Sequence, residues 1–299
     1  QARFFNVHNP DEIEALIDDK TKVIFFESLT NPSIDVADIG AITAIAKKHG
    51  ILTIVDNTVA TPVLCRPFEY GVDVVVHSAS KYTTGQGLAI GGIMVERPDL
   101  VDFIRANPRY PQFNEADESY HGLVYVDVPL PLYTLRARLS LLRDLGAVVS
   151  PFNSWLFIQG IETLALRMRE HSRNALAVAE FLEGHPLVKK VNYPGLKSNA
   201  NYVNAQKYFD GGMASGLLSF EVESLDKAKQ IVDATKLFSL VVNIGDSKSI
   251  ITHPASTTHQ QLSAEELVAC GVPSGLIRLS IGLEASADLI ADLAQALDA

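Results

Sequence analysis

The sequence predicts an α/β protein in two parts: a large domain with a mostly parallel sheet, and a smaller C-terminal α/β domain. Two observations lead to this class. Apolar strand-like runs alternate with helical patterns over residues 22–96. After an irregular stretch, a long helical pattern leads into a second set of strands and helices. We place the domains at residues 1–158 and 159–299, with the long helix as the entrance to the second.

The large domain begins with a short helical stretch at residues 10–17, and its strands are predicted at 22–27, 51–56, 73–78 and 91–96. A helix over residues 38–49 separates the first two strands. Asp38 is its predicted N-cap and Gly50 its stop, which makes a parallel βαβ unit.

Residues 107–128 break this pattern with prolines, aromatics and acids, and we expect this excursion to cover or line a site, as a lid does. Helical periodicity returns afterwards. The elements predicted after the excursion are helices at 132–145, 151–182, 226–235, 263–270 and 286–298, and strands within 187–195, 215–223, 236–245 and 276–284.

The amino-acid composition argues against two classes of binding partner. With 35 acidic and 25 basic residues the net charge is -10, and no block of Lys or Arg is present, which argues against nucleic acid or an anionic membrane as partner. No apolar run reaches the roughly 18 residues of a membrane span. A small molecule is therefore the expected partner.

Two further expectations follow, one from the cysteines and one from the start of the chain. Cys65 and Cys270 lack the CxxC spacing of a zinc site, so we expect no metal, no disulfide framework and a reducing cytoplasm. The chain starts at Gln1 and reaches its first strand quickly, which suggests a fragment of a longer protein.

Polar residues follow three of the predicted strands, namely Asn31, Asp56 and Lys81, the last with Ser78 and Ser80 before it. Each step from Asn31 to Asp56 to Lys81 is 25 positions, about one crossover unit, so the three should meet at one sheet edge.

Singly, such residues are usually turn formers or solvated side chains. Together, a lysine, a carboxylate and two hydroxyls supply what pyridoxal phosphate (PLP) requires: an amine for covalent attachment, an anion for the pyridine nitrogen and donors for the phosphate.

Two rival sites are weaker. The glycines of residues 85–92 do not form the dinucleotide fingerprint, and they precede a strand instead of opening a helix. His253 and His259 lack the helical spacing of a zinc pair and flank a turn-like run, so we take both as structural.

Beside these residues, five segments carry a resemblance to a known family. They are "ESLTNPSIDVADI", "VDNTVATP", "HSASKYTTGQG", "NIGDSKSIITHPASTTH" and "LIRLSIGLE". In order and spacing they resemble the cystathionine γ-synthase family, the Cys/Met-metabolism group of PLP enzymes. The resemblance spans essentially the whole chain and implies the fold-type I architecture of PLP-dependent transferases.

The resemblance also implies roles for individual residues. Lys81 would bind the cofactor covalently and act as the catalytic base, Asp56 would pair with the pyridine nitrogen, and Ser78 and Ser80 would bind the phosphate. Arg278 would clamp the α-carboxylate of the substrate, because its planar fork can hold a carboxylate through two hydrogen bonds.

Asn31 and the backbone near Asn243 match positions that assist the same carboxylate. Within the family, "DESYHGLVYVDV" and "HPASTTHQQL" look like the O-acetylhomoserine sulfhydrylase branch. Ser80 and Gln86 depart from the commoner threonine and histidine. The family's phosphate loop, its ring-stacking aromatic and its Tyr/Arg pair donated to a neighbouring subunit would lie ahead of Gln1.

The expected activity is replacement at Cγ of O-acetyl-L-homoserine by sulfide or a small thiol, which gives homocysteine or methionine and acetate. A cystathionine γ-synthase, a methionine γ-lyase and a catalytically incomplete structural subunit are the alternatives. The resemblance further implies a homotetramer made of two dimers.

Overall fold

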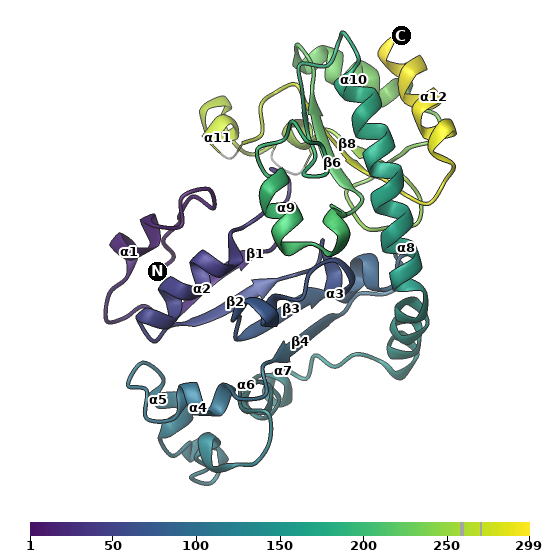
Figure 1. Ribbon diagram of the computed structural model, residues 1–299. Helices are drawn as coiled ribbons and strands as arrows, with labels where there is room; N and C mark the ends of the chain where they lie inside the picture. The colour runs from purple at the N-terminus through teal and green to yellow at the C-terminus, as the bar shows by residue number, and fades with distance from the viewer. Residues whose placement is uncertain (258–259, 270) are drawn as a thin grey trace.

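The computed structural model describes residues 1–257, 260–269 and 271–299, and these residues form two β-sheets with helices around them (Figure 1). The first sheet has the order β1-β2-β3-β4 and the second the order β5-β6-β9-β8-β7. The strands of the first sheet are β1 (Val23–Glu27), β2 (Leu52–Asp56), β3 (Val74–Ser78) and β4 (Gly92–Glu96). Those of the second are β5 (Lys190–Asn192), β6 (Leu217–Glu221), β7 (Ser239–Leu240), β8 (Ile250–Thr252) and β9 (Leu276–Ser280).

The α-helices are α1 (Glu12–Leu16), α2 (Ile39–Lys48), α3 (Thr61–Leu64), α4 (Leu100–Ile104), α5 (Pro111–Asn114), α6 (Leu132–Arg136), α7 (Arg143–Leu145), α8 (Pro151–Glu183), α9 (Tyr202–Tyr208), α10 (Leu225–Ala234), α11 (Ala264–Ala269) and α12 (Ser286–Leu297). The predicted helices are present, whereas α3, α4, α5 and α9 were not predicted. A π-helical segment, η5 (Ala137–Leu142), joins α6 to α7, so the predicted helix at 132–145 is one helical stretch with a wider middle.

The βαβ unit is confirmed. The side chain of Asp38 accepts a hydrogen bond from the Ala41 N–H and caps α2, and Gly50 follows the helix with a φ of +62°. Such a left-handed residue is the usual way to end a helix, and glycine adopts it without strain.

The α/β class is confirmed, and both sheets are mixed. In the first sheet β1, β2 and β3 run parallel, whereas β4 runs antiparallel to β3. The reason is the connection between β3 and β4, which turns back through residues 79–91 without a crossover helix. In the second sheet only β7 and β8 pair in parallel.

The first sheet is covered on both faces. Alternate residues of its strands, among them Phe26, Val55 and Val75, share a buried cluster with Ile39 and Ile42 of α2. The excursion at 107–128 packs on the other face. There Tyr110, Phe113 and Tyr125 form a cluster with Leu52 and Val74, so the excursion is a packed cover over the N-terminal ends of these strands.

Helix α8 connects the two sheets. Figure 1 shows it running from beside the first sheet, at its N-terminal end, to the second sheet with α10 and α12. Its start is explained by Ser150, whose hydroxyl accepts the Asn153 N–H, and by Pro151 at the first helical position. Of the helices described, α8 included, none combines the length and apolar character needed to cross a bilayer.

Candidate active site

Three polar side chains lie on one face of the first sheet, at the C-terminal ends of its parallel strands. Glu27 pairs with Asp56 in register, and Asp56 pairs with Val76. Residues paired in this way point to the same face, and Ser78 shares it because it is two positions beyond Val76. The predicted meeting of Asp56 and Ser78 at this edge is confirmed, and Glu27 is an addition that the sequence reading missed.

Thr58 holds the two predicted cofactor residues together. Its N–H donates to Asp56 Oδ1 at 2.8 Å, and its hydroxyl oxygen accepts the Ser78 N–H at 2.7 Å. One residue therefore fixes the carboxylate at the end of β2 and the backbone at the end of β3. Only the "DNT" sequence directly after β2 could have signalled it, since short polar side chains after a strand commonly bond nearby backbone.

Lys81 lies in η2 (Ala79–Thr83), a π-helical turn after β3, and its own backbone is non-helical with φ -95° and ψ -125°. Its ammonium donates to Asn243 Oδ1 at 2.6 Å. Burial, and after it the positive charge of Arg278, lower the pKa of Lys81 from its ordinary value. The site thus contains an amine that loses its proton more easily than an exposed lysine does.

Arg278 lies on β9 and is only 5% exposed. Its guanidinium donates to Asn31 Oδ1 at 3.0 Å and to the Asn243 carbonyl at 3.2 Å. Both partners are neutral, and no carboxylate of the described residues pairs with it. Burial lowers its pKa. A buried cation with neutral partners favours an incoming anion, so this geometry suits a carboxylate ligand.

The structure therefore joins four predicted site residues in one chain of contacts, from Lys81 through Asn243 to Arg278 and Asn31. The two serines differ from one another. The Ser80 hydroxyl accepts the Gly91 N–H at 3.0 Å and so ties the lysine turn to the start of β4. The Ser78 hydroxyl has no hydrogen bond to the described residues. The phosphate role of both serines stays a prediction.

The lysine turn is held against α8. Arg167 donates to the carbonyls of Tyr82 and Thr83, at 2.7 and 3.2 Å. Gly160 touches the turn so closely that a Cβ there would lie 2.1 Å from the Thr83 carbonyl oxygen, well inside van der Waals contact. These contacts join segments about eighty positions apart, and no local pattern announces them.

We expect Gly160→Ala to lower the free energy of unfolding by about 2–3 kcal/mol, because the added methyl group must push α8 away from the turn that carries Lys81. Urea denaturation measures this. Gly184→Ala, at the other end of α8, is the matched control, since its Cβ would meet nothing closer than 3.7 Å. Equal stability of the two variants would contradict the close contact.

Glu27 has an unusual carboxyl group. Burial, aided by the charge of Asp56 and opposed by the hydrogen bond from the Asn31 N–H, raises its pKa to about 7. Because this folded-state pKa lies above the unfolded value of 4.5, the folded chain holds more protons between these values, and stability falls as the pH rises from 4.5 through 7.

We expect Glu27→Gln to raise the free energy of unfolding at pH 8 by about 1–2 kcal/mol and to change it little at pH 5. The amide keeps an acceptor for the Asn31 N–H, which lies 3.0 Å from the carboxylate, and removes the charge. Urea titrations at both pH values test this, with exposed Glu162→Gln as the control. A gain of equal size at both pH values would show that the charge is not its cause.

The other candidate sites have structural explanations. His253 is buried between the Ser256 hydroxyl and the Ser274 carbonyl, each 2.8 Å from a ring nitrogen. Among the described residues no cluster of His, Cys, Asp or Glu could hold a metal ion. Burial raises the pKa of the Cys65 thiol to about 12, as for an inert core cysteine. His259 and Cys270 lie outside the described residues.

Comparison with known proteins gives one consistent family. The family described as "Cys/Met metabolism PLP-dependent enzyme" matches residues 1–298. An O-acetyl-L-homoserine sulfhydrylase of Leptospira meyeri is 44% identical, and the alignment covers 99% of this chain and 69% of that protein. A homocysteine/cysteine synthase of Saccharomyces cerevisiae is 42% identical, over 100% of this chain and 70% of that protein.

A crystal structure from Campylobacter jejuni is also similar. Its description proposes an O-acetylhomoserine (thiol)-lyase and records a pyridoxyl-lysine monophosphate. The TM-score is 0.98 at 56% identity, and the match covers 100% of this chain and 71% of that one.

Proposed function

We propose that this chain, which belongs to the Cys/Met metabolism PLP-dependent enzyme family, replaces the acetoxy group at Cγ of O-acetyl-L-homoserine by sulfide or a small thiol. The Cγ–O bond breaks and acetate leaves with the bonding electrons. A Cγ–S bond forms, and the product is homocysteine, or methionine if the thiol is methanethiol. The observation that carries the proposal is buried Arg278, which shares Asn243 with the amine of Lys81.

The residues present fit PLP as cofactor. Lys81 would hold it covalently, Asp56 would provide the negative charge for the pyridine nitrogen, and Ser78 and Ser80 would donate to the phosphate. When bound, the cofactor supplies a cationic ring that accepts electron density from the Cα of an amino acid. The half-buried, partly desolvated amine and the fixed carboxylate match these needs.

The residues of the chain then have separate tasks. Arg278, oriented by Asn31 and Asn243, binds the α-carboxylate of the substrate and thereby presents Cα to Lys81. The lowered pKa of Lys81 lets its Nζ accept the Cα proton and later return a proton to the product. Asn243 Oδ1, 2.6 Å from Nζ, orients the amine while it accepts the proton and returns it.

The sulfur donor and the product distinguish this proposal from its neighbours. O-acetyl-L-homoserine should be given to the purified protein, loaded with PLP, in three reactions: with sulfide, with cysteine, and alone. We expect rapid homocysteine formation with sulfide, little cystathionine with cysteine, and little α-ketobutyrate from the substrate alone. Cystathionine as the main product would favour a γ-synthase, and α-ketobutyrate a γ-lyase. No product in any reaction would favour a structural subunit.

Three expectations accompany the function as proposals: domains at residues 1–158 and 159–299, a homotetramer of two dimers, and a cytoplasmic location. The domain bounds rest on the pattern of strands and helices in the sequence, the location on the cysteine spacing, and the tetramer on the resemblance to the family. Light scattering of the purified protein tests the tetramer directly.

A further inference from the structure

Arg278 shares a row of side chains with a residue far from the active site. Asn192 of β5 pairs with Ser219 of β6, and Ser219 pairs with Arg278 of β9. Side chains paired in register point to the same face of a sheet, and neighbouring strands are about 5 Å apart, so Asn192 lies about 10 Å from Arg278 along this row.

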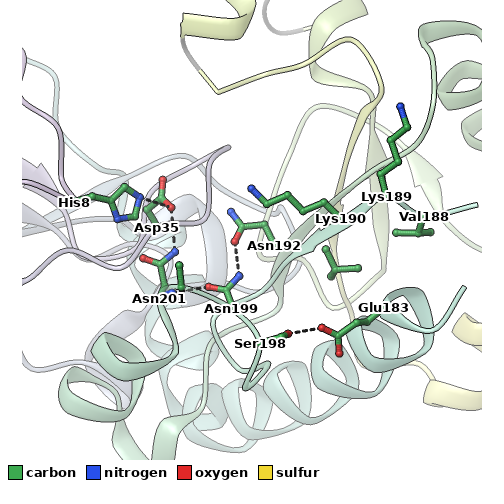
Figure 2. A pocket seen from close by; sticks show the side chains of 12 residues that line it. His8, Asp35, Glu183, Val188, Lys189, Lys190, Asn192, Ser198, Asn199 and Asn201 are labelled. Carbon is green, nitrogen blue, oxygen red and sulfur yellow. Dashed lines mark hydrogen bonds and ion pairs between the residues drawn. The ribbon is translucent and has the colours of Figure 1, made fainter.

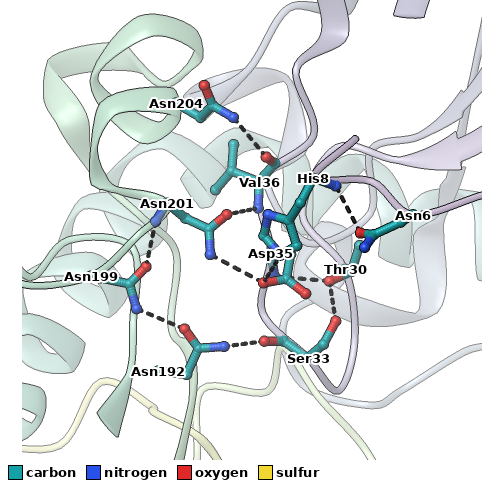
Figure 3. Close-up of polar contacts among 10 residues, drawn as sticks. All are labelled: Asn6, His8, Thr30, Ser33, Asp35, Val36, Asn192, Asn199, Asn201 and Asn204. Atoms are coloured by element: carbon teal, nitrogen blue, oxygen red, sulfur yellow. Dashed lines mark hydrogen bonds and ion pairs between the residues drawn. The ribbon is translucent and has the colours of Figure 1, made fainter. Parts of the chain in front are cut away.

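Both residues contact one loop, residues 30–36, which follows β1. Arg278 donates to the side chain of Asn31, and the amide of Asn192 donates to the carbonyl oxygen of Ser33 (Figure 3). The row on the second sheet therefore holds the loop at two points. One of these points is the asparagine that orients the guanidinium.

The loop is closed by hydrogen bonds between its own residues. The Thr30 and Ser33 hydroxyl oxygens are 2.6 Å apart, and Thr30 Oγ1 accepts the Asp35 N–H at 2.8 Å. The Thr30 N–H donates to the Asp35 carbonyl at 2.9 Å. Because these bonds span Asn31, a displacement of Ser33 is transmitted to it.

Two further asparagines support Asn192. The amide of Asn199 donates to Asn192 Oδ1 at 2.7 Å and accepts the Asn201 N–H at 2.8 Å. Asn201, only 4% exposed, accepts the Val36 N–H and donates to Asp35 Oδ1, both at 3.1 Å. Figure 3 shows these side chains as one network between the loop and the second domain.

Open space lies beside this network, so close packing does not surround its hydrogen bonds on every side. A cavity of about 440 Å³ opens beside the network and is lined by His8, Asp35, Lys190, Asn192 and Asn199 among others (Figure 2). A second cavity of about 260 Å³ is lined by Ser33, Asn192 and Ser219. Neither of the two cavities is lined by Lys81, Asp56 or Arg278, so both lie outside the lysine cluster.

We infer that Asn192 is a positioning residue for recognition of the substrate carboxylate, acting through Ser33 and Asn31 on Arg278. The inference rests on the proposed function for the role of Arg278. It predicts that loss of the hydrogen bond to Ser33 weakens binding of ligands with an α-carboxylate and leaves ligands without one unaffected.

The test measures binding without turnover. L-Norvaline, which has no leaving group at Cγ, and butylamine, which is norvaline without its carboxylate, are titrated into the PLP-loaded protein by calorimetry. Two variants are compared with wild type. Asn192→Ala removes the whole amide, whereas Asn192→Asp keeps an acceptor for Asn199, replaces the donor to Ser33 by an oxygen and adds a negative charge.

For both variants we expect norvaline to bind on the order of tenfold more weakly, with butylamine binding unchanged. Ser198→Ala is the control, because the Ser198 hydroxyl lines the same cavity but contacts Glu183 and not the loop. Unchanged norvaline binding in Asn192→Asp, or an equal loss for both ligands, would overturn the inference. Failure of the proposed reaction would appear separately, as carboxylate-dependent binding without formation of homocysteine.

Discussion

Lys81→Ala is expected to lower kcat for homocysteine formation by at least about 10⁴-fold, because the variant lacks both the group that would attach the cofactor and the base at Cα. Among the described residues, the chain of contacts through Asn243 to Arg278 contains Lys81 and no other lysine that could take over. The rate is measured with sulfide and O-acetyl-L-homoserine at saturating PLP.

Lys229→Ala is the matched control for this loss, since Lys229 is an exposed lysine on α10, which packs beside the second sheet. It should retain the wild-type rate. Substantial turnover by Lys81→Ala, with the fold intact by circular dichroism, would remove Lys81 from the mechanism and with it the assignment of the lysine turn as the active site.

Arg278→Lys is expected to lower kcat/KM for O-acetyl-L-homoserine by about 10²-fold, and Arg278→Ala by about 10³-fold or more. Lysine retains the charge but loses the fork that can bond Asn31, Asn243 and a carboxylate together. The loss should appear mainly in KM for the amino acid, while the KM for sulfide stays near that of wild type.

Steady-state kinetics with each substrate varied in turn separates these effects. Arg173→Lys on α8 is a suitable control, because Arg173 is exposed and pairs with Glu170. If both Arg278 variants changed the KM for sulfide and not that for the amino acid, Arg278 would belong to a thiol site and the carboxylate assignment would be wrong.

The sequence predicted those site residues that follow strands. Asn31, Asp56 and Lys81 could be found because the carboxyl ends of parallel strands share an edge, and this rule needs only the order of elements along the chain. Arg278 and Asn243 came from the resemblance alone. Their contacts with Asn31 and Lys81 span 247 and 162 positions, and a local pattern does not encode such distances.

The residues that were missed have the same explanation. Thr58, Arg167 and Asn192 support the site through backbone contacts that depend on how the elements pack, and each has an ordinary sequence neighbourhood. The sequence left the direction of β4 open, because a glycine-rich connection does not show whether it crosses the sheet or turns back. Strand β8, three residues long, was too short to show any periodicity.

The central claim, that Lys81 is the attachment point of PLP, is tested most directly by borohydride reduction of the PLP-loaded protein followed by peptide mass spectrometry. Reduction makes the bond between a lysine and PLP permanent. We expect a phosphopyridoxyl group on the peptide that contains Lys81 and on no other lysine peptide. Modification of a different lysine, or an unmodified Lys81 peptide after reduction at saturating PLP, would contradict the assignment.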